Sequence, residues 1–401
     1  MSVLFYIFIL IQLPIAFYLV QPVVLLVIHY LKKFTFPYRS PISRTSLIEK
    51  DFDFAAIITA HEDTRFIPPL VDSLLKQKYL NFHVYIVADA CDISELYIDD
   101  PRVRLLKPEK DFHAKIKSIQ FAADNFVRKH DALVIFDSDN LVHPDYLSVL
   151  NKYFQQGYRA VQTQMLSKNT STIYSRLDSI GHIYHTFLER KMRMELGLSA
   201  HILGLGIAID TELYKEIMYK DRLGGFDKKL QADIVKRIPK LGYAEEAIVY
   251  DEKVDDGKTL EKQRTRWLFT YFHYFKANWD LFATGVRRFN FNLIYFGLIV
   301  LRPPLFIVIG LGIFYGLINL FINPVYSIIW GVILLTYVVS FILIVLGQSK
   351  QKGMGNALLF IPAFVFRQVK ALLKIKQAGR SFLKTEHTKV LYIEDILNEP
   401  A

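Results

Sequence analysis

Residues 132–140 read ALVIFDSDN, an apolar run that ends directly in four polar residues. The run from Ala132 to Phe136 is short and apolar, which is typical of a strand that is buried on both faces. In a parallel sheet, ligands bind just beyond the carboxyl ends of the strands. The segment therefore predicts a buried strand that carries Asp137 and Asp139 to a ligand-binding edge.

Two similar apolar runs precede this strand. Phe54 to Thr59 reads FAAIIT and His83 to Ala88 reads HVYIVA, and between them Ile67 to Lys76 places its apolar residues on one helical face. This order indicates a strand, a crossover helix and a second, parallel strand. We therefore expect an α/β domain with a mostly parallel sheet between about Asp51 and Asp256.

The composition indicates a mixed protein with a soluble domain and membrane segments. Of 401 residues, 52% are hydrophobic and 22% are charged, a balance unlike that of an ordinary soluble enzyme or a pure transporter. The formal charge of +10 favours anionic lipids and sugar phosphates as partners. Nucleic acid is not expected, because the basic residues adjoin apolar runs. The single cysteine, Cys91, excludes an internal disulfide and a cysteine-based zinc site and favours a reducing cytoplasm.

Three apolar segments have the length needed to cross a bilayer of roughly 30 Å. The first runs from Val3 to Leu31 and is expected to be a retained anchor, because it has no basic n-region and no clear cleavage site. The second, Leu293 to Ile322, is interrupted by Arg302-Pro303-Pro304, and the third runs from Val325 to Leu346. We expect the second and third segments to be joined by a turn.

Lysines follow the first and third segments, at Lys32, Lys33, Lys350 and Lys352. Because positive residues flank spans on the cytoplasmic side, the long middle domain is expected in the cytoplasm. The protein is then an integral protein of the plasma (inner) membrane. For the stretch from Ala357 to Leu373 an interfacial helix is favoured, and a further crossing remains open, since basic residues interrupt it.

The sequence divides into five expected parts. These are an N-terminal transmembrane anchor (1–33), a cytoplasmic α/β domain (34–256), an interfacial helical region (257–288), two transmembrane helices (289–348), and a C-terminal interfacial or third membrane helix with a cytoplasmic tail (349–401). Within the second part, Ile173 to Arg193 forms an amphipathic pattern whose charged residues, among them Glu189 and Arg190, are expected in water or at anionic headgroups. This helix lies either on the membrane surface or under the sheet.

Asp137 and Asp139 are candidate metal ligands. They are one residue apart beyond the strand, so they project to the same side if the strand geometry continues. Mg²⁺ and Mn²⁺ prefer such hard oxygen ligands, and a metal there bridges two phosphates. On its own, the same tripeptide is also typical of a polar turn after a strand.

A second polar group lies near the end of the soluble part. Gln263, Arg266 and Trp267 share one helical face, which combines an amide, a guanidinium that fits a phosphate, and an indole that stacks on a sugar. A basic, aromatic helix at the membrane surface has the same composition, and the two interpretations are compatible. Asp233 lies near the start of a predicted helix, where the helix dipole by itself favours an acidic residue.

Four ordered motifs resemble those of the membrane-integrated family 2 glycosyltransferases, which include synthases of cellulose, chitin, hyaluronan and poly-N-acetylglucosamine. The motifs are Thr59–Asp63 (TAHED), Ala88–Asp92 (ADACD), Asp137–Asp139 (DSD) and Gln263–Trp267 (QRTRW, a Q-x-x-R-W motif). The resemblance runs from Phe54 to about Trp267. It implies a GT-A-like nucleotide-sugar-binding domain that is flanked by transmembrane and interfacial helices.

The resemblance also implies roles for single residues. Nucleotide-sugar contacts are implied for Thr59, Ala60, Glu62, Asp63, Asp89, Lys115, Lys117, Asp137, Ser138, Gln263, Arg266 and Trp267; metal ligation for Asp137 and Asp139; a general base at Asp233; acceptor contacts at Gly204, Gly206 and Trp267; and further diphosphate contacts at Thr385 and His387. Two positions depart from the family, which usually has Asn-Glu at Glu62-Asp63 and Glu-Asp at Ala232-Asp233.

The implied activity is inverting transfer of a hexosyl or N-acetylhexosaminyl group from a nucleotide-diphosphate sugar, expected to be a UDP sugar. The implied cofactor is Mn²⁺ or Mg²⁺, and the implied partners are a glycan or lipid acceptor and membrane lipids. Processive extension of a cell-surface polysaccharide or exopolysaccharide is the first expectation. Single transfer to a lipid acceptor and a catalytically silent subunit that binds nucleotide or glycan are the alternatives.

Overall fold

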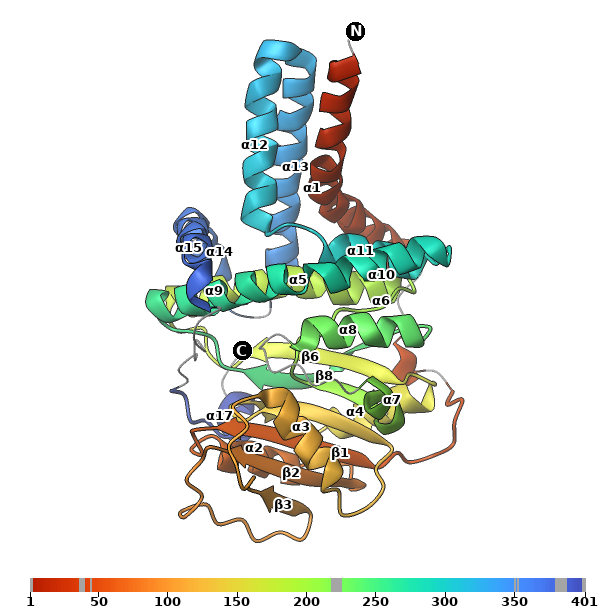
Figure 1. The fold of residues 1–401 in the computed structure, drawn as a ribbon, viewed down its shortest axis with the longest axis vertical. Helices are drawn as coiled ribbons and strands as arrows, with labels where there is room; N and C mark the ends of the chain where they lie inside the picture. The colour runs from red at the N-terminus through yellow and green to blue at the C-terminus, as the bar shows by residue number, and fades with distance from the viewer. Residues whose placement is uncertain are drawn as a thin grey trace.

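A computed structural model of the chain describes residues 3–35, 40–43, 45–217, 226–349, 351, 353–378 and 388–398. Figure 1 shows three levels: a sheet domain, a layer of helices that run crosswise above it, and upright helices that extend away from both. Four residues with roles expected from the sequence lie outside the described residues, namely Lys350, Lys352, Thr385 and His387.

The domain contains one eight-stranded sheet in the order β3-β2-β1-β4-β7-β6-β8-β5. The strands are β1 (Phe54–His61), β2 (Phe82–Asp89), β3 (Val103–Leu106), β4 (Ala132–Asp137), β5 (Leu141–Val142), β6 (Ala160–Ser167), β7 (Ile207–Asp210) and β8 (Gly242–Asp251). The pairs β1/β2, β1/β4, β2/β3 and β6/β8 are parallel, and β4/β7, β6/β7 and β5/β8 are antiparallel. The expected α/β class with a mostly parallel sheet is therefore confirmed.

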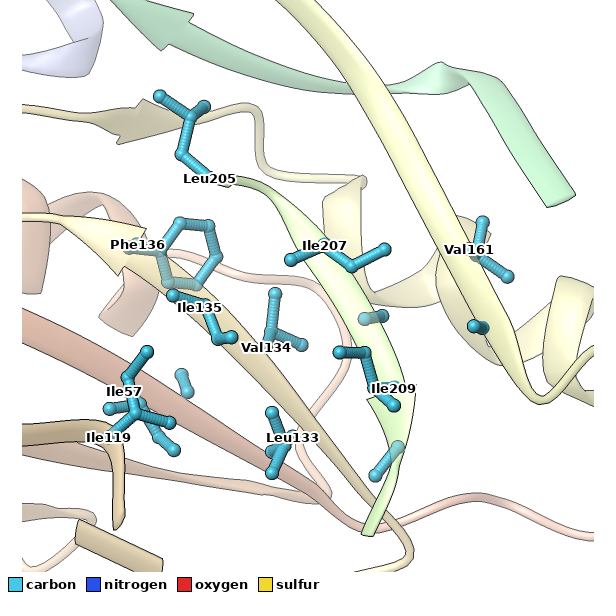
Figure 2. Packing of buried hydrophobic residues seen from close by; sticks show 14 of the residues in the cluster. Ile57, Ile119, Leu133, Val134, Ile135, Phe136, Val161, Leu205, Ile207 and Ile209 are labelled. Atoms are coloured by element: carbon cyan, nitrogen blue, oxygen red, sulfur yellow. The ribbon is translucent and has the colours of Figure 1, made fainter. Parts of the chain in front are cut away.

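The predicted strand at 132–136 is also confirmed, and it lies in the interior of the sheet between β1 and β7. Figure 2 shows its buried side chains beside Ile57 of β1 and beside Ile207 and Ile209 of β7. In the register, Leu133 pairs with Ile209 and Ile135 pairs with Ile207. The continuous apolar run reflects this position, because a central strand is covered on both faces.

Short helices cover the sheet and connect its strands. They are α2 (Ile67–Leu75), α3 (Lys115–Asp124), α4 (Tyr146–Gln155), α7 (Thr211–Ile217) and α8 (Phe226–Arg237), with a 3₁₀ turn, η1 (Pro41–Ser43), before β1. Near the C-terminus, α17 (Ile393–Leu397) returns to the sheet domain, where Ile393 packs with Leu141 and Tyr250. The helix predicted at 67–76 is thus present as α2.

The crosswise layer between the sheet and the upright helices is built mainly from α5, α9, α10 and α11 (Figure 1). Its elements are α5 (Ile173–Thr186), a π-helical turn η2 (Phe187–Lys191), α6 (Met192–Glu195), α9 (Gly257–His273), α10 (Phe275–Arg287) and α11 (Phe291–Val300). Three more helices pack against this layer: α14 (Met354–Leu358) contacts α5, and α15 (Ile361–Leu373) and α16 (Ile375–Ala378) contact α9. With 13 residues, α15 is shorter than the roughly 20 residues of a typical span.

Within the described residues, three helices are long and apolar enough to cross a membrane. They are α1 (Val3–Thr35), α12 (Leu305–Ile322) and α13 (Pro324–Gln348), which stand side by side in Figure 1. The apolar run that begins at Leu293 does not form one helix, because α11 ends at Val300 and α12 begins after Pro304. Proline lacks the backbone donor that a helix interior needs and restricts the residue before it, so Arg302-Pro303-Pro304 separates the two.

The segment from Ile173 to Arg193 packs against the upright helices. Tyr184 and Phe187 are each 1% exposed and belong to one apolar cluster with Leu19 of α1 and Tyr337 of α13. The Tyr184 ring centroid also lies 4.7 Å from that of Phe341. The apolar face therefore contacts the upright apolar helices, rather than the underside of the sheet.

The expectation that the charged residues of this segment remain in water is wrong for Glu189, Arg190 and Arg193. Arg190 and Arg193 are 4% and 1% exposed, and Glu189 forms an ion pair with Arg302. Arg193 lies over aromatic rings, with its guanidinium carbon 4.7 Å from the centroid of Phe296. The sequence pattern marks these residues as a polar face, but the chain between α11 and α12 covers that face and supplies an ionic partner.

Gly285 of α10 and Gly297 of α11 allow the two helices to pack closely as a hairpin, because a Cβ at either position would lie 2.6 Å from an atom of the other helix. A Cβ atom at Gly297 lies 2.6 Å from the Cα of Phe282, so we expect Gly297→Ala to force the helices apart and to lower the free energy of unfolding by about 1–3 kcal/mol. Gly331→Ala in α13 is the control, because a Cβ there meets no heavy atom within 4 Å. Thermal unfolding of both variants in detergent measures the effect. Equal melting temperatures for the two variants contradict the close approach.

Candidate active site

Three parallel strands end at the same edge of the sheet. The register pairs His61 with Asp89 and Thr59 with Asp137. Because β1, β2 and β4 run in the same direction, their last residues lie side by side, as expected for a ligand-binding edge. The polar residues that follow three separate strands in the sequence therefore meet in one place.

A cavity of about 1240 Å³ begins at this edge. Its lining continues past the crosswise helices α5 and α9 to residues of α12, α13 and α15. Pockets for single small molecules usually measure about 300–1,000 Å³, so there is room here for more than one ligand group. Residues of the strand edge and the start of α3 line it, among them Thr59, Ala60, His61, Glu62, Asp89, Lys115 and Asp137.

Lys115 lies at the centre of this edge, in the first turn of α3. Its Nζ is 2.5 Å from Oδ1 of Asp137 and 2.9 Å from the carbonyl oxygen of Gly204. Gly204 has a φ of +86°, and a Cβ there lies only 3.3 Å from the Cβ of Asp227. Glycine at this position therefore combines the left-handed backbone with the close approach of Asp227, which also lines the cavity.

The predicted face of α9 is turned towards the same cavity, which Gln263, Arg266 and Trp267 all line. Arg264, between them in sequence, forms an ion pair with Asp178 of α5, and its guanidinium carbon lies 4.3 Å from a Trp267 ring centroid. Burial lowers the pKa of Arg266, an effect that Asp137 and Asp227 oppose. The Arg266 guanidinium is thus attracted by Asp137 of the strand edge and by Asp227 of α8.

The opposite side of the edge is formed by residues that follow β1 and β2. Asp89 is 2% exposed, and it accepts a hydrogen bond from the backbone N–H of Phe112 at 2.6 Å. Nδ1 of His61 lies 3.2 Å from an oxygen of Asp89. Among the described residues, His61, Glu62 and His113 form a group whose ligand atoms all lie within 4.8 Å of one another. Neither histidine is among the site residues predicted from the sequence, although His61 lies inside the TAHED motif.

Five predicted site residues do not line the cavity, namely Asp63, Lys117, Ser138, Asp139 and Gly206. Asp63 forms an ion pair with Arg65 at 2.7 Å. A Cβ at Gly206 would lie 2.6 Å from Thr163 Oγ1, so the neighbouring side chains leave room only for glycine there. Asp139 is 5% exposed, and its carbonyl oxygen accepts a hydrogen bond from the Lys168 ammonium.

Asp233 does not line the cavity either, and its role as general base stays a prediction. Its carboxylate contacts Lys229 at 3.2 Å and Arg237 at 3.9 Å, both on its own helix. Asp227 and Gln231 line the cavity instead. They are four residues apart and share a face of α8, whereas Asp233 lies on another face. Sequence position alone does not reveal which face of this helix points inward.

Hard oxygen atoms at the strand edge fit a divalent metal. Asp137 at the end of β4 and Asp251 at the end of β8 both line the cavity. Asn140, which follows β4, donates a 3.2 Å hydrogen bond to Asp251 and so links the ends of these two strands. Asp139 lies between Asp137 and Asn140 in sequence and is buried. Burial lowers the pKa of Lys168, whose ammonium neighbours Asp139 and Asp251. The residues present thus supply the carboxylate ligands that Mg²⁺ or Mn²⁺ prefers.

Comparisons with known proteins agree with this geometry. The family model described as "Glycosyltransferase like family 2" matches residues 52–270, more than half of the chain. No curated protein matches the sequence. The mannosyltransferase PcManGT from Pyrobaculum calidifontis, solved in complex with GDP-Man and Mn²⁺, is 13% identical, with a TM-score of 0.51 over 90% of this chain and 98% of that one.

A second solved structure, the fragment 1–349 of TarS from S. aureus, is 15% identical with a TM-score of 0.38. The match covers 55% of this chain and 65% of that one, so the chain spans less than two thirds of that relative. At such identities a likeness between structures concerns the fold only. The sheet, the strand-edge cavity and the family match together show a GT-A-like α/β domain, and the chain belongs to glycosyltransferase family 2.

Proposed function

We propose that this protein is an inverting glycosyltransferase that moves a sugar from a nucleotide-diphosphate sugar to a lipid acceptor in the membrane. The observation that carries the proposal is the single cavity that runs from the strand edge to the membrane helices α12 and α13. A transferase for a membrane-embedded acceptor needs such a continuous path, because the polar donor and the apolar acceptor arrive from different solvents.

The donor end is assigned to the strand edge. Asp89 and Glu62 are suited to hydrogen-bond a nucleoside, and Lys115 and Arg266 bring positive charge to a diphosphate. PcManGT was solved with GDP-Man, which supports a nucleotide sugar as the donor class here. We retain a UDP sugar as the expected donor, carrying a hexosyl or N-acetylhexosaminyl group.

Asp137 and Asp139 would hold a divalent metal at this edge, which would supply positive charge to the departing diphosphate. Mn²⁺ in the PcManGT complex supports this assignment. The chain's own cations act at the same edge, where Lys115 contacts Asp137 at 2.5 Å and Lys253 contacts Asp251 at 2.9 Å. These ammonium groups orient the carboxylates and add positive charge beside the phosphates.

Asp227 is the group that we assign as general base for an acceptor hydroxyl. It lines the cavity, packs against Gly204 and lies near Arg266. A carboxylate there accepts the proton of the hydroxyl as its oxygen attacks the anomeric carbon. One displacement of this kind inverts the anomeric centre. Trp267, with 43% of its surface exposed, offers an indole face on which a sugar ring stacks.

Processive extension of a cell-surface polysaccharide or exopolysaccharide is the second candidate. It is favoured by the Gln263–Trp267 motif, whose Gln263, Arg266 and Trp267 line the cavity as the resemblance implies. The apolar lining near α12 and α13 favours the lipid acceptor instead. A catalytically silent subunit is the third, and Lys115, Asp137 and Asp227 around one cavity argue against it.

The deciding experiment incubates the full chain in lipid nanodiscs with radiolabelled nucleotide sugars and then partitions the products. Label in the organic phase supports transfer to a lipid. Label in a polymer that alcohol precipitates supports the second candidate and overturns the first. A chain that neither transfers nor hydrolyses any of the sugar nucleotides is the result expected of a silent subunit.

The assignment of the base predicts different effects for two aspartates of α8. Asp227→Asn removes the proton acceptor from the cavity, so kcat should fall by about 10²- to 10⁴-fold while the affinity for the donor changes little. Asp233→Asn is the matched control and should keep nearly the wild-type kcat, because its carboxylate only pairs with Lys229 and Arg237. Steady-state kinetics with varied donor measures both constants. If Asp233→Asn lowers kcat and Asp227→Asn does not, Asp233 is the general base instead.

The metal assignment predicts that EDTA abolishes transfer and that Mn²⁺ or Mg²⁺ restores it. Asp139→Asn should raise the metal concentration needed for half-maximal activity at least tenfold, because an amide is a weaker ligand than a carboxylate. Asp63→Asn serves as the control, since Asp63 pairs with Arg65 outside the cavity. Undiminished activity after chelation removes the metal from the proposal and leaves charge neutralisation to the lysines.

We also propose that the protein lies in the plasma (inner) membrane with its sheet domain in the cytoplasm. Lys32 and Lys33 after the first span support this orientation, and the three apolar helices support membrane association.

This orientation predicts the labelling of single cysteines in a Cys91→Ser background. Tyr97, 85% exposed in the sheet domain, and Phe321, 89% exposed at the far end of α12, are suitable positions. In intact cells, an impermeant maleimide should label a cysteine at 321 and should reach one at 97 only after the membrane is permeabilised. Labelling of a cysteine at position 97 in intact cells would show that the sheet domain lies outside the cell, opposite to the proposed orientation.

A further inference from the structure

A cluster of largely buried charged and polar side chains lines the cavity where it approaches the upright helices. Glu189 and Arg190 come from the π-helical turn η2, His201 from the loop before β7, and Arg302 from the link between α11 and α12. All four line the cavity. Single π-helical turns occur often at functional sites, because they shift side chains out of the regular helical order.

Glu189 is fully engaged inside this cluster. Its Oε1 accepts hydrogen bonds from Arg302 at 2.7 Å and from His185 at 2.9 Å, and its Oε2 lies 2.9 Å from Nδ1 of His201. Burial raises the pKa of the Glu189 carboxyl, but the two histidines outweigh that effect and hold the pKa well below its usual value. Glu189 is therefore an ionised structural partner rather than a catalytic acid.

Arg190 is left without an ionic partner among the described residues. It is 4% exposed, and its guanidinium donates one hydrogen bond, to Thr186 Oγ1 at 3.3 Å. Its Nε is buried and makes no hydrogen bond to the protein. Glu189 and Asp227 attract it electrostatically, but neither forms an ion pair with it. A buried guanidinium in this state is stabilised by an anion that enters the cavity.

His201 adds a second unsatisfied group. Burial is the main cause that lowers the pKa of its imidazole to about 3, so the ring is neutral at pH 7. With Nδ1 directed at Glu189, its buried Nε2 has no hydrogen-bond partner in the structure. A neutral Nε2 opposite a carboxylate-bound Nδ1–H accepts a hydrogen bond from a hydroxyl or from a protonated phosphate oxygen.

The surroundings of the cluster restrict which anion fits. The residues that follow Arg302 in sequence add apolar groups to the lining, namely Pro304, Leu305, Phe306 and Ile309, and Phe341 of α13 also contributes. A free inorganic anion gains nothing from these apolar groups, whereas a hydrocarbon chain does. The donor diphosphate has its own cations, Lys115 and Arg266, at the strand edge. The combination of arginines with an apolar passage is the chemistry that recognises a lipid with a phosphate in its head.

We propose that Arg190, with Arg302 and His201, binds a phosphate group in the head of the lipid acceptor. This proposal rests on the proposed function and adds the chemical class of its acceptor. The phosphate lies between the hydrocarbon chain and the reacting hydroxyl. It thereby fixes how far the acceptor head extends from the membrane helices towards Asp227.

The test measures binding of hexadecyl phosphate, hexadecanol and inorganic phosphate to the full chain in detergent. Hexadecyl phosphate should bind at least tenfold more tightly than either of the others, because only it uses both the arginines and the apolar lining. Arg190→Gln should weaken binding of hexadecyl phosphate by about 10- to 100-fold, the usual effect of losing a hydrogen bond to a charged group. Binding of hexadecanol and of the donor nucleotide should not change.

Arg287→Gln is the matched control for surface charge. The Arg287 side chain is 70% exposed on α10 and does not line the cavity, so the variant should bind hexadecyl phosphate like the wild type. Equal losses in both variants indicate a general charge effect and overturn the site. Equal affinity of the wild type for hexadecanol and hexadecyl phosphate also overturns it. Inorganic phosphate that binds as tightly as hexadecyl phosphate contradicts the lipid origin of the anion.

Two further measurements keep the outcomes separate. If Arg190→Gln does not fold, the thermal shift of the wild type by hexadecyl phosphate against hexadecanol replaces it, and equal shifts overturn the phosphate site. In the transfer assay, Arg190→Gln should raise the KM for a phosphate-bearing lipid and leave the donor KM unchanged. Equal transfer to neutral lipids by both proteins rejects the phosphate site but retains the proposed function. Absence of any lipid product from the wild type rejects the proposed function itself.

Discussion

The parallel pairing of β1 with β2 and β4 is the constraint on which the rest of the structure depends. Parallel strands must end at the same edge, so the register His61 with Asp89 and Thr59 with Asp137 brings together residues that are up to 78 positions apart in sequence. The strands are buried on both faces, and a slip by one residue reverses which side chains face each layer. The strand interior is therefore apolar and only the ends carry chemistry, which allows a stable core and a reactive edge in the same sheet.

The second organising feature is the way the membrane helices are joined to this edge. Ionic contacts fix the joint: Arg264 of α9 pairs with Asp178 of α5, and Arg302 pairs with Glu189. Buried ion pairs contribute little net stability, because desolvation offsets their attraction, but a mismatched partner is costly. Such pairs therefore specify the position of the helices more than they strengthen it. As a result, Trp267 and Arg266 face the strand edge although α9 lies in the crosswise layer.

Because the upright helices pack against the strand edge in this way, the cavity has a polar end and an apolar end. Its strand edge is polar, with carboxylates beside ammonium and guanidinium groups, and its other end is lined by prolines and apolar residues of the membrane helices. In the proposed function a water-soluble donor and a lipid-soluble acceptor meet at one anomeric carbon, and neither a purely polar pocket nor a purely apolar one receives both. The buried cluster around Glu189 lies where the two regions meet, which explains why so many charged groups are buried close to the membrane helices.

The sequence alone predicts the α/β class, the strand before Asp137, the family and ten of the residues that line the cavity, because these depend on local periodicity and on motifs that follow strand ends. It did not determine which face of α8 points inward, so it selected Asp233, whereas the structure brings Asp227 and Gln231 to the cavity. It also assigned Glu189 and Arg190 to water. Helical periodicity distinguishes one face from another, but what covers a polar face is decided by contacts with distant segments. Only the tertiary structure brought the link at Arg302 against Glu189, because that contact depends on how the membrane helices dock onto the sheet domain.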